Sequence, residues 1–370
     1  MERFDVQVSG SGIVGLSLAL ALSRLGLSVA FTAQAAGRSP PRDDVRAYAL
    51  NAASIALLRS LKVWEALPAD ARTPVYEMRV HGDAPSAAIE FSAWEQCVGS
   101  LACITDAAAL EHELATALRF APHVTHLGAG ERHATASLVA HCEGRGASHP
   151  GARFGTSDYG QRAIAARLVA SQPHAHVARQ WFRAPDVLAL LPFDRPQAGR
   201  SYGLVWSLPA DRADALLAAS AAAFEIELAE ATGAEAGELH LASERAAWPL
   251  AVGQSSAWCG HGWVLLGDAA HVVHPLAGQG LNLGLADVVA LVAVIAEREP
   301  WRGLGDERLL RRYVRQRAAP TWAMLRTTDA LQRLFSHSSA PVRELRNNGL
   351  SLVNRIAPLK RWLIARALDS

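Results

Sequence analysis

The sequence predicts an α/β fold: a Rossmann-like domain with an inserted antiparallel sheet, followed by C-terminal helices. Three observations support this prediction. A strand, a glycine-rich turn and a helix follow one another at 4–25, and the same pattern recurs at 263–296. Four short apolar segments between 159 and 208 are typical of antiparallel strands. Helical patterns at 307–317 and 321–334 then follow.

Composition indicates an ordinary globular protein. The 370 residues suffice for one large domain or two closely packed ones, with 50% apolar and 19% charged residues. A net charge of +1 gives no field for nucleic acid, so no such partner is expected. The four cysteines form no C-x-x-C and the 14 histidines no H-E-x-x-H, which argues against a metal site and for a reducing, cytoplasmic compartment. Neither a signal peptide nor a membrane span is predicted.

The N-terminal turn has the spacing G-x-G-x-x-G between a predicted strand at 4–8 and a predicted helix at 16–25. The first glycine makes the tight turn, the second lets a pyrophosphate approach, and the third lets the helix pack on the strand. A turn that serves packing alone is the alternative. The residues expected at a dinucleotide are Gly10, Gly12, Ile13, Val14 and Gly15.

The second strand, at 28–32, lacks the acid that normally binds the ribose hydroxyls. Ala33 and Gln34 stand there, and the next acids are Asp43 and Asp44. The glutamine can make only a weaker hydrogen bond to a hydroxyl. We therefore expect an intact pyrophosphate end and an impaired ribose end.

The stretch 263–289 carries the most informative pattern. An apolar strand stops at Gly267-Asp268, a loop with Pro275 follows, and a helix is predicted from 282 to about 296. An aspartate at the end of a strand can accept hydrogen bonds from ribose or ribityl hydroxyls, and glycines at a helix start let backbone N–H groups approach an anion. A turn without a ligand is the alternative. The expected ligand contacts are Asp268, Gly278, Gln279, Gly280, Leu281 and Asn282.

Arg46 precedes another short apolar segment. Near a cofactor, its guanidinium could hold a polarised carbonyl, a carboxylate or a phenolate. A surface arginine paired with Asp43 or Asp44 is the alternative, at equal weight.

Further elements complete the pattern. A hairpin is predicted at 75–81 and 88–91, and the stretch 209–235 is predicted to be helical because alanine favours helix. The tail, 342–370, holds six basic and two acidic residues, so it is either a packed helix with a solvated basic face or a helix on an anionic membrane. The other predicted helices are at 52–61 and 106–118, and the other strands are at 138–146, 159–169, 177–182, 187–191 and 202–208.

Taken together, the two glycine motifs resemble those of flavoprotein aromatic hydroxylases with the para-hydroxybenzoate hydroxylase fold, and most closely the ubiquinone-biosynthesis hydroxylases. The most specific match is G-D-A-A-H-x-x-H-P-L-A-G-Q-G-L-N-L-G at 267–284. Weaker matches lie at 46–50, 159–164, 334–336 and 346–350, so the resemblance covers nearly the whole chain.

This resemblance implies an FAD-dependent monooxygenase that uses NAD(P)H and O2 to hydroxylate a polyprenylated phenol or quinone precursor of ubiquinone. It implies that the N-terminal glycines face the FAD pyrophosphate, Asp268 the ribityl chain, and Pro275 with 278–282 the isoalloxazine ring. Arg46, Pro275 and His271 are the residues expected nearest the reaction, although His271 and His274 also suit a structural role. Implied partners are a lipid-like aromatic substrate, a ubiquinone-biosynthesis complex and, peripherally, the inner membrane face.

Four departures from the family bear on the adenosine half of the site. The acid after the second strand is missing, Glu143 replaces the aspartate of an Asp-Gly motif, and Thr105-Asp106-Ala107 replaces Glu-Asn-Arg at a helix start. The segment 124–143 is also short. Two alternatives to an active hydroxylase therefore stay open: a non-catalytic scaffold in ubiquinone biosynthesis, and a flavoprotein reductase acting on a lipid.

The elements and the resemblance together predict the domain boundaries. A discontinuous FAD-binding domain is expected at 1–72, 99–158 and 240–320, and a substrate domain at 73–98 and 159–239. A C-terminal helical segment is expected at 321–370.

Overall fold

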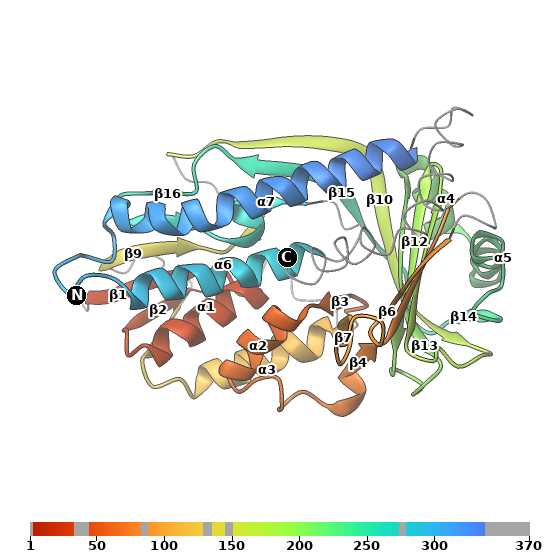
Figure 1. Cartoon of the computed structure of the whole chain (residues 1–370), viewed down its shortest axis with the longest axis horizontal. Helices are drawn as coiled ribbons and strands as arrows, with labels where there is room; N and C mark the ends of the chain where they lie inside the picture. Colours follow the sequence, from red (N-terminus) through yellow and green to blue (C-terminus); the bar gives the residue numbers. More distant parts are fainter. Residues whose placement is uncertain are drawn as a thin grey trace.

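A computed structural model describes residues 3–32, 44–82, 88–128, 135–144, 151–273 and 279–336, which form three sheets with helices around them (Figure 1). The parallel sheet has the strand order β16-β17-β9-β1-β2-β8, and only its β16–β17 pair is antiparallel. Its strands are β1 (Arg3–Ser9), β2 (Val29–Thr32), β8 (Val124–Leu127), β9 (Thr135–His141), β16 (Cys259–Gly260) and β17 (Trp263–Leu265).

The large sheet has the order β18-β15-β10-β13-β12-β11-β5-β6, with β14 also paired to β10. Its pairs are antiparallel except β11 with β5. The predicted hairpin and the four predicted strands between 159 and 208 are all present. The strands are β5 (Glu77–His81), β6 (Ala88–Ser92), β10 (Phe154–Ala170), β11 (Val177–Arg183), β12 (Asp186–Phe193), β13 (Ser201–Pro209), β14 (Leu239–Leu241), β15 (Ala246–Ser255) and β18 (His271–Val272).

A small sheet lies between the other two in Figure 1. It pairs β3 (Ala47–Leu50) and β4 (Arg72–Val75) with β7 (Ala102–Asp106), all antiparallel. Figure 1 shows the parallel sheet toward one end of the molecule and the large sheet at the other. The α/β architecture predicted from the sequence is therefore confirmed. Strands β14, β15 and β18 add residues from the predicted 240–320 range to the large sheet.

The helices pack mainly around the parallel sheet, and the pair α4–α5 covers the large sheet. Apolar side chains of α1 and α6, among them Leu18, Leu22, Leu285 and Leu291, are fully buried in one core with the parallel strands. The helices are α1 (Ile13–Arg24), α2 (Ala52–Ser60), α3 (Ala107–Arg119), α4 (Ala210–Ala218), α5 (Ala221–Thr232), α6 (Gln279–Ala296) and α7 (Glu307–Ser336), with short 3-10 turns η1 (Ala69–Ala71) and η3 (Gly267–Ala269).

Two helix predictions were wrong in detail. The stretch 209–235 forms two helices, because Ser220 begins α5 as an N-cap whose hydroxyl accepts a hydrogen bond from the Ala223 N–H at 3.2 Å. The two predicted C-terminal helices are one helix, α7, with Pro320 inside it. Tyr313 and Leu325 are buried on the two sides of the proline, so packing maintains the helix where one backbone hydrogen bond is lost.

Helix α6 is long and apolar enough to cross a membrane, but more than half of it is buried inside the protein. It packs against α1, α2 and α7. This pattern is that of a core helix.

Candidate functional site

The turn between β1 and α1 depends on glycine for two close backbone approaches. Gly10 has φ +117°, and a Cβ there would overlap the carbonyl of Cys142, the residue after β9. A Cβ at Gly15 would overlap the carbonyl oxygen of Gly10. These two positions therefore need glycine for packing, as the motif predicts.

Gly12 differs from its neighbours because packing does not require it. It is the N-cap residue of α1, with φ −79° and ψ 174°, and no side chain caps the helix there. A Cβ at Gly12 would meet no atom of the described residues within 4 Å. The Leu16 N–H is bonded to the Gly12 carbonyl at 3.0 Å, and the N–H groups before it lie in the first turn of the helix. Such an open helix N-terminus fits an anionic group such as a pyrophosphate.

Ile13 and Val14 direct their side chains into the protein. Ile13 belongs to the core beside the parallel sheet. A Cβ added at Gly284 of α6 would lie 2.7 Å from Val14 Cγ2, and one at Gly267 would lie 3.3 Å away. These glycines let α1, η3 and α6 approach closely, so any ligand contact of Ile13 and Val14 would use their backbone N–H groups.

Asp268 is exposed between buried neighbours, Gly267 and Ala269, at the end of β17. Its negative charge acts on Tyr48 of β3, which places the aspartate near the Arg46 segment. The predicted ribityl ligand and the predicted flavin neighbour therefore lie in the same part of the fold.

Asn282 fastens α6 to the elements beside it. Its Oδ1 accepts from the Ser54 hydroxyl at 2.8 Å and the Asn51 N–H at 3.1 Å, and its Nδ2 donates to the Ala49 carbonyl at 2.8 Å. The side chain is therefore used within the protein, which points to a positioning role. Its predicted neighbours Gln279, Gly280 and Leu281 are half-buried in the first turn of α6.

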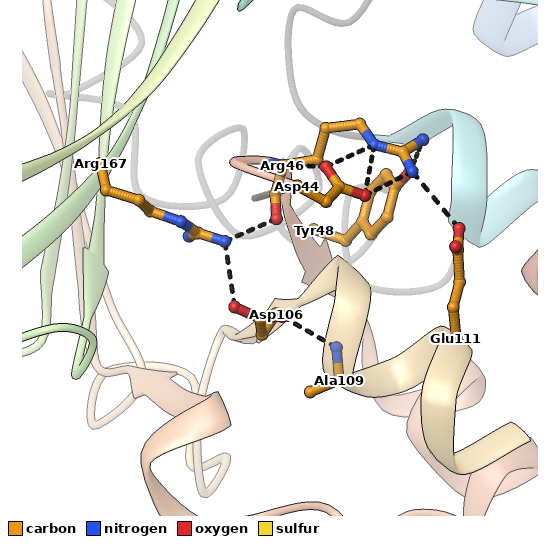
Figure 2. Close-up of polar contacts among 7 residues, drawn as sticks. All are labelled: Asp44, Arg46, Tyr48, Asp106, Ala109, Glu111 and Arg167. Atoms are coloured by element: carbon orange, nitrogen blue, oxygen red, sulfur yellow. Dashed lines mark hydrogen bonds and ion pairs between the residues drawn. The ribbon is translucent and has the colours of Figure 1, made fainter. Parts of the chain in front are cut away.

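Arg46 is enclosed by polar groups (Figure 2). Its Nε and a terminal nitrogen donate to the Asp44 carboxylate at 2.9 and 2.6 Å, and it also approaches the Tyr48 hydroxyl at 3.1 Å and Glu111 at 3.4 Å. The pairing with Asp44 that one alternative predicts is therefore present, and the contact with a ligand stays a prediction. The Arg46 side chain is still about one-third exposed, with 37% of its surface accessible, so part of it remains open to a ligand.

Burial and neighbouring charges shift the pKa values of the groups around Arg46. Burial favours a neutral Asp44, but hydrogen bonds from Arg46 and the charges of Arg46 and Arg167 outweigh it and lower the pKa of this carboxyl. Burial raises the pKa of Tyr48 to about 12, against the opposing charge of Arg46. Burial also raises the pKa of Glu111. At neutral pH the group therefore presents a charged guanidinium beside a neutral phenol.

A buried ion pair joins this group to the large sheet, and the sequence analysis missed it. Arg167 of β10 donates to the Arg46 carbonyl at 2.7 Å and to the Asp106 carboxylate at 3.2 Å (Figure 2). It also stacks over the Phe193 ring at 4.1 Å. Asp106 also caps α3 through the Ala109 N–H at 2.9 Å. Asp106, within the family departure at 105–107, thus belongs to a structural ion pair. The sequence signal for this pair was a charged residue, Arg167, within a largely apolar strand.

His271 is almost fully buried and forms part of a second charged network. Its Nε2 lies 2.7 Å from Asp287 Oδ2, which also accepts from the Gly267 N–H at 3.0 Å. Arg317 of α7 donates to the other Asp287 oxygen at 2.8 Å. Burial would raise the pKa of Asp287, but His271 and Arg317 lower it. This network fixes the η3 turn that carries Asp268, which favours the structural alternative for His271.

Several predicted residues lie outside the described part of the chain: Pro275, Gly278, His274, Ala33, Gln34 and Asp43. Glu143, at the departure from the Asp-Gly motif, is described. One of its oxygens lies 3.2 Å from His141 Nδ1, while the other is buried without a hydrogen-bond partner among the described residues. Within the described ranges, no cluster of histidine, cysteine, aspartate or glutamate could hold a metal ion.

Fold and site together define a Rossmann-type protein with a glycine-rich turn and an uncapped helix N-terminus at the start of α1. The FAD binding domain family matches residues 3–171 and 121–328 of this chain. Ubiquinone hydroxylase UbiL of Rhodospirillum rubrum is 30% identical, over 99% of this chain and 90% of the relative. The 3-demethoxyubiquinol 3-hydroxylase of Escherichia coli is 28% identical, over 98% of each chain.

The fold is also similar to that of a solved structure, Klebsiella pneumoniae HpxO complexed with FAD and uric acid. The TM-score is 0.76 at 17% identity, over 99% of this chain and 97% of that one. The chain belongs to the FAD binding domain family and, within it, is a flavoprotein monooxygenase related to the ubiquinone-biosynthesis hydroxylases. Its cofactor is FAD, which the open N-terminus of α1 fits.

Proposed function

We propose that this protein hydroxylates the aromatic ring of a polyprenylated phenol or quinone precursor in ubiquinone biosynthesis, with NAD(P)H as reductant and O2 as oxygen source. The observation that carries the proposal is the open position at Gly12, where neither packing nor a side-chain cap uses the N-terminus of α1. The names of the related hydroxylases support the substrate class. We place the protein in the cytoplasm, at the inner membrane face.

In this proposal the chain mainly positions its cofactor and substrate. Bound FAD supplies the reduction of O2 and the transfer of one oxygen atom to the ring. The first N–H groups of α1 bind the pyrophosphate, and the exposed Asp268 carboxylate accepts hydrogen bonds from the ribityl hydroxyls. Pro275 and the backbone at 278–282 would border the ring system.

Arg46 and Tyr48 provide the electrostatics beside this site. The Asp44 carboxylate and the Tyr48 hydroxyl hold the guanidinium in one orientation, with part of its surface open. A fixed positive charge stabilises negative charge that develops on a neighbouring ring or oxygen, and orientation before the reaction reduces the reorganisation needed. Because burial raises the pKa of Tyr48 to about 12, the phenol is neutral and can donate a hydrogen bond throughout the physiological range.

Titration of the purified protein with FAD, followed by flavin fluorescence, tests the cofactor site with the variant Gly12→Val. The backbone angles at Gly12 suit valine and no described atom opposes the new side chain, so folding should be kept. Loss of one or two charge-assisted hydrogen bonds should raise the FAD dissociation constant about a hundredfold. Gly99→Val is the matched control, since a Cβ there also meets no described atom within 4 Å. Equal affinities of Gly12→Val and Gly99→Val would contradict the assignment.

Turnover separates the proposed hydroxylase from its two alternatives. With NAD(P)H, O2 and a polyprenylated phenol, the product mass should increase by one oxygen atom. A product that gains only hydrogen would identify the lipid reductase. Rescue of ubiquinone synthesis by Gly12→Val and Asp268→Ala variants would identify a scaffold that needs no flavin.

A further inference from the structure

Helix α7 presents a narrow row of exposed basic and aromatic side chains. These residues are Arg308, Arg311, Arg315, Trp322 and Arg326, and we name them the arginine row. At 100° per residue, they fall within about 60° around the helix axis. The opposite side of α7, with Tyr313 and Arg317, is buried against the protein. Figure 1 shows α7 running beside α6.

The positive charge of the row is not neutralised within the described structure. Arg308, Arg315 and Arg326 form no ion pair with any described residue, and Arg311 pairs with Glu307 at 2.6 Å. The nearby acids have other partners: Glu299 and Asp306 both bind Arg302, and Asp329 accepts a hydrogen bond from the Tyr159 hydroxyl. The row therefore carries three unpaired guanidinium groups on one side of a helix.

Two exposed tryptophans accompany these arginines. Trp322 lies within the row, is 56% exposed, and lies under Arg326 at 5.6 Å. Trp301, 75% exposed, precedes α7 and borders a shallow recess together with Arg308 and Arg311. Tryptophan and arginine are the side chains favoured at the interface between an anionic bilayer and water.

We propose that the arginine row docks this protein on an anionic membrane surface. The row extends about 27 Å along one side of α7 from Arg308 to Arg326, so its side chains can contact one surface together. A second copy packed through the same face would oppose arginine to arginine. The chain after α7 is also unsuited to bind the arginine row, because 342–370 holds six basic and only two acidic residues and would repel the row's positive charge. Phospholipid headgroups supply the complementary charge, and they bind interfacial helices with basic faces.

Docking goes beyond the proposed reaction and can be measured without turnover. The test is flotation of the full-length protein with phosphatidylcholine vesicles, with or without about 30% phosphatidylglycerol, at low and high salt. Binding should require the anionic lipid and should decrease at high salt, because the ions screen exposed charges.

The variant Arg308→Gln/Arg315→Gln/Arg326→Gln should weaken vesicle binding about a hundredfold, at roughly fivefold per arginine. The matched control is Arg59→Gln/Arg119→Gln/Arg153→Gln, which changes net charge equally at exposed positions elsewhere. The control should bind as the parent does, and both triple variants should keep the parent's melting temperature.

Three outcomes would overturn the proposal. The first is no binding to anionic vesicles, which would leave an acidic protein as the partner of this face. The second is unchanged binding by the arginine-row variant together with lost binding in Arg343→Gln/Arg346→Gln/Arg355→Gln, which would assign docking to the tail. The third is a change of oligomeric state in the arginine-row variant, measured by light scattering, which would show that a second copy covers the face.

Discussion

The contacts around Val14 and the contacts around Arg167 both join distant segments, but by different means. Val14 packs against Gly267 and Gly284, where glycines let three backbones approach without any charge. Arg167 instead links β10 to Asp106 and the Arg46 carbonyl through a buried guanidinium. The first kind of contact tolerates no added atom. The second depends on a charge that must keep its partners. Mutations that add atoms near Val14 should therefore destabilise the protein through atomic overlap. Mutations of the Arg167 pair should destabilise it by leaving a buried charge without its partner.

The largest effect is expected for Gly15→Ala in the glycine region. The new methyl group would overlap the Gly10 carbonyl oxygen, which belongs to rigid backbone and cannot rotate away. We expect the free energy of unfolding to fall by about 5 kcal/mol or more, which equals the whole stability of a marginally stable protein. Urea unfolding followed by circular dichroism measures it. Gly12→Val is the comparison variant and should keep nearly the parent's stability. Similar destabilisation of the two variants would contradict the claim that packing requires glycine at Gly15 but not at Gly12.

The next effect is expected for Asp287→Asn, which removes the charge that pairs Arg317 and His271 below the Asp268 turn. Both partners are buried, so the free energy of unfolding should fall by about 3–5 kcal/mol. Because the folded protein lowers the pKa of Asp287, its stabilisation is complete above the unfolded value and is lost as pH falls through the folded value. Below about pH 4 the parent should therefore lose stability more steeply than the variant. Parallel acid dependence in the two proteins would contradict this.

A smaller effect is expected for Arg167→Met. Asp106 keeps its hydrogen bond from the Ala109 N–H, and the Arg46 carbonyl keeps one from the Ala107 N–H at 3.2 Å, so neither partner is left without a donor. We expect a loss of about 2–3 kcal/mol by urea unfolding. A double-mutant cycle with Asp106→Asn should show a coupling free energy, since the two side chains are in contact. Additive effects would show that the pair is not energetically linked.

The smallest effect is expected for Arg162→Met on the same strand. Arg162 pairs with Asp214 at the surface, so its loss should change stability by about 0.5 kcal/mol or less. Equal losses for Arg162→Met and Arg167→Met would remove the distinction between the two arginines.

The same comparison explains what the sequence could predict. The glycine turns, Asp268 and most strands follow from local spacing, because a tight turn or a buried strand requires particular residues at fixed intervals. The Arg167–Asp106 pair joins residues 61 positions apart, and nothing near either one specifies the other. Asn282 is predicted as a ligand contact through the 278–282 backbone, and its side chain binds β3 and α2. The residue type alone does not separate a ligand contact from a structural contact, because an amide side chain can make either.

The continuity of α7 was not predictable for a related reason. Proline is a strong helix breaker in isolation, so 307–317 and 321–334 were treated as separate helices. Burial of Arg317 on Asp287 and of Leu325 beyond the proline holds both halves in line. Tertiary packing decided the outcome, and local propensity gave no sign of it.

The route of the chain through the three sheets has a practical consequence. The chain leaves the parallel sheet after β2, passes through the small and large sheets, returns for β8 and β9, leaves again for β10 to β15, and returns for β16 and β17. Neither end of the molecule is therefore encoded by one uninterrupted piece of the gene. Excision of the large sheet as a minimal fragment would sever strands from their neighbours, so an engineer who wants to alter this sheet should exchange side chains in place.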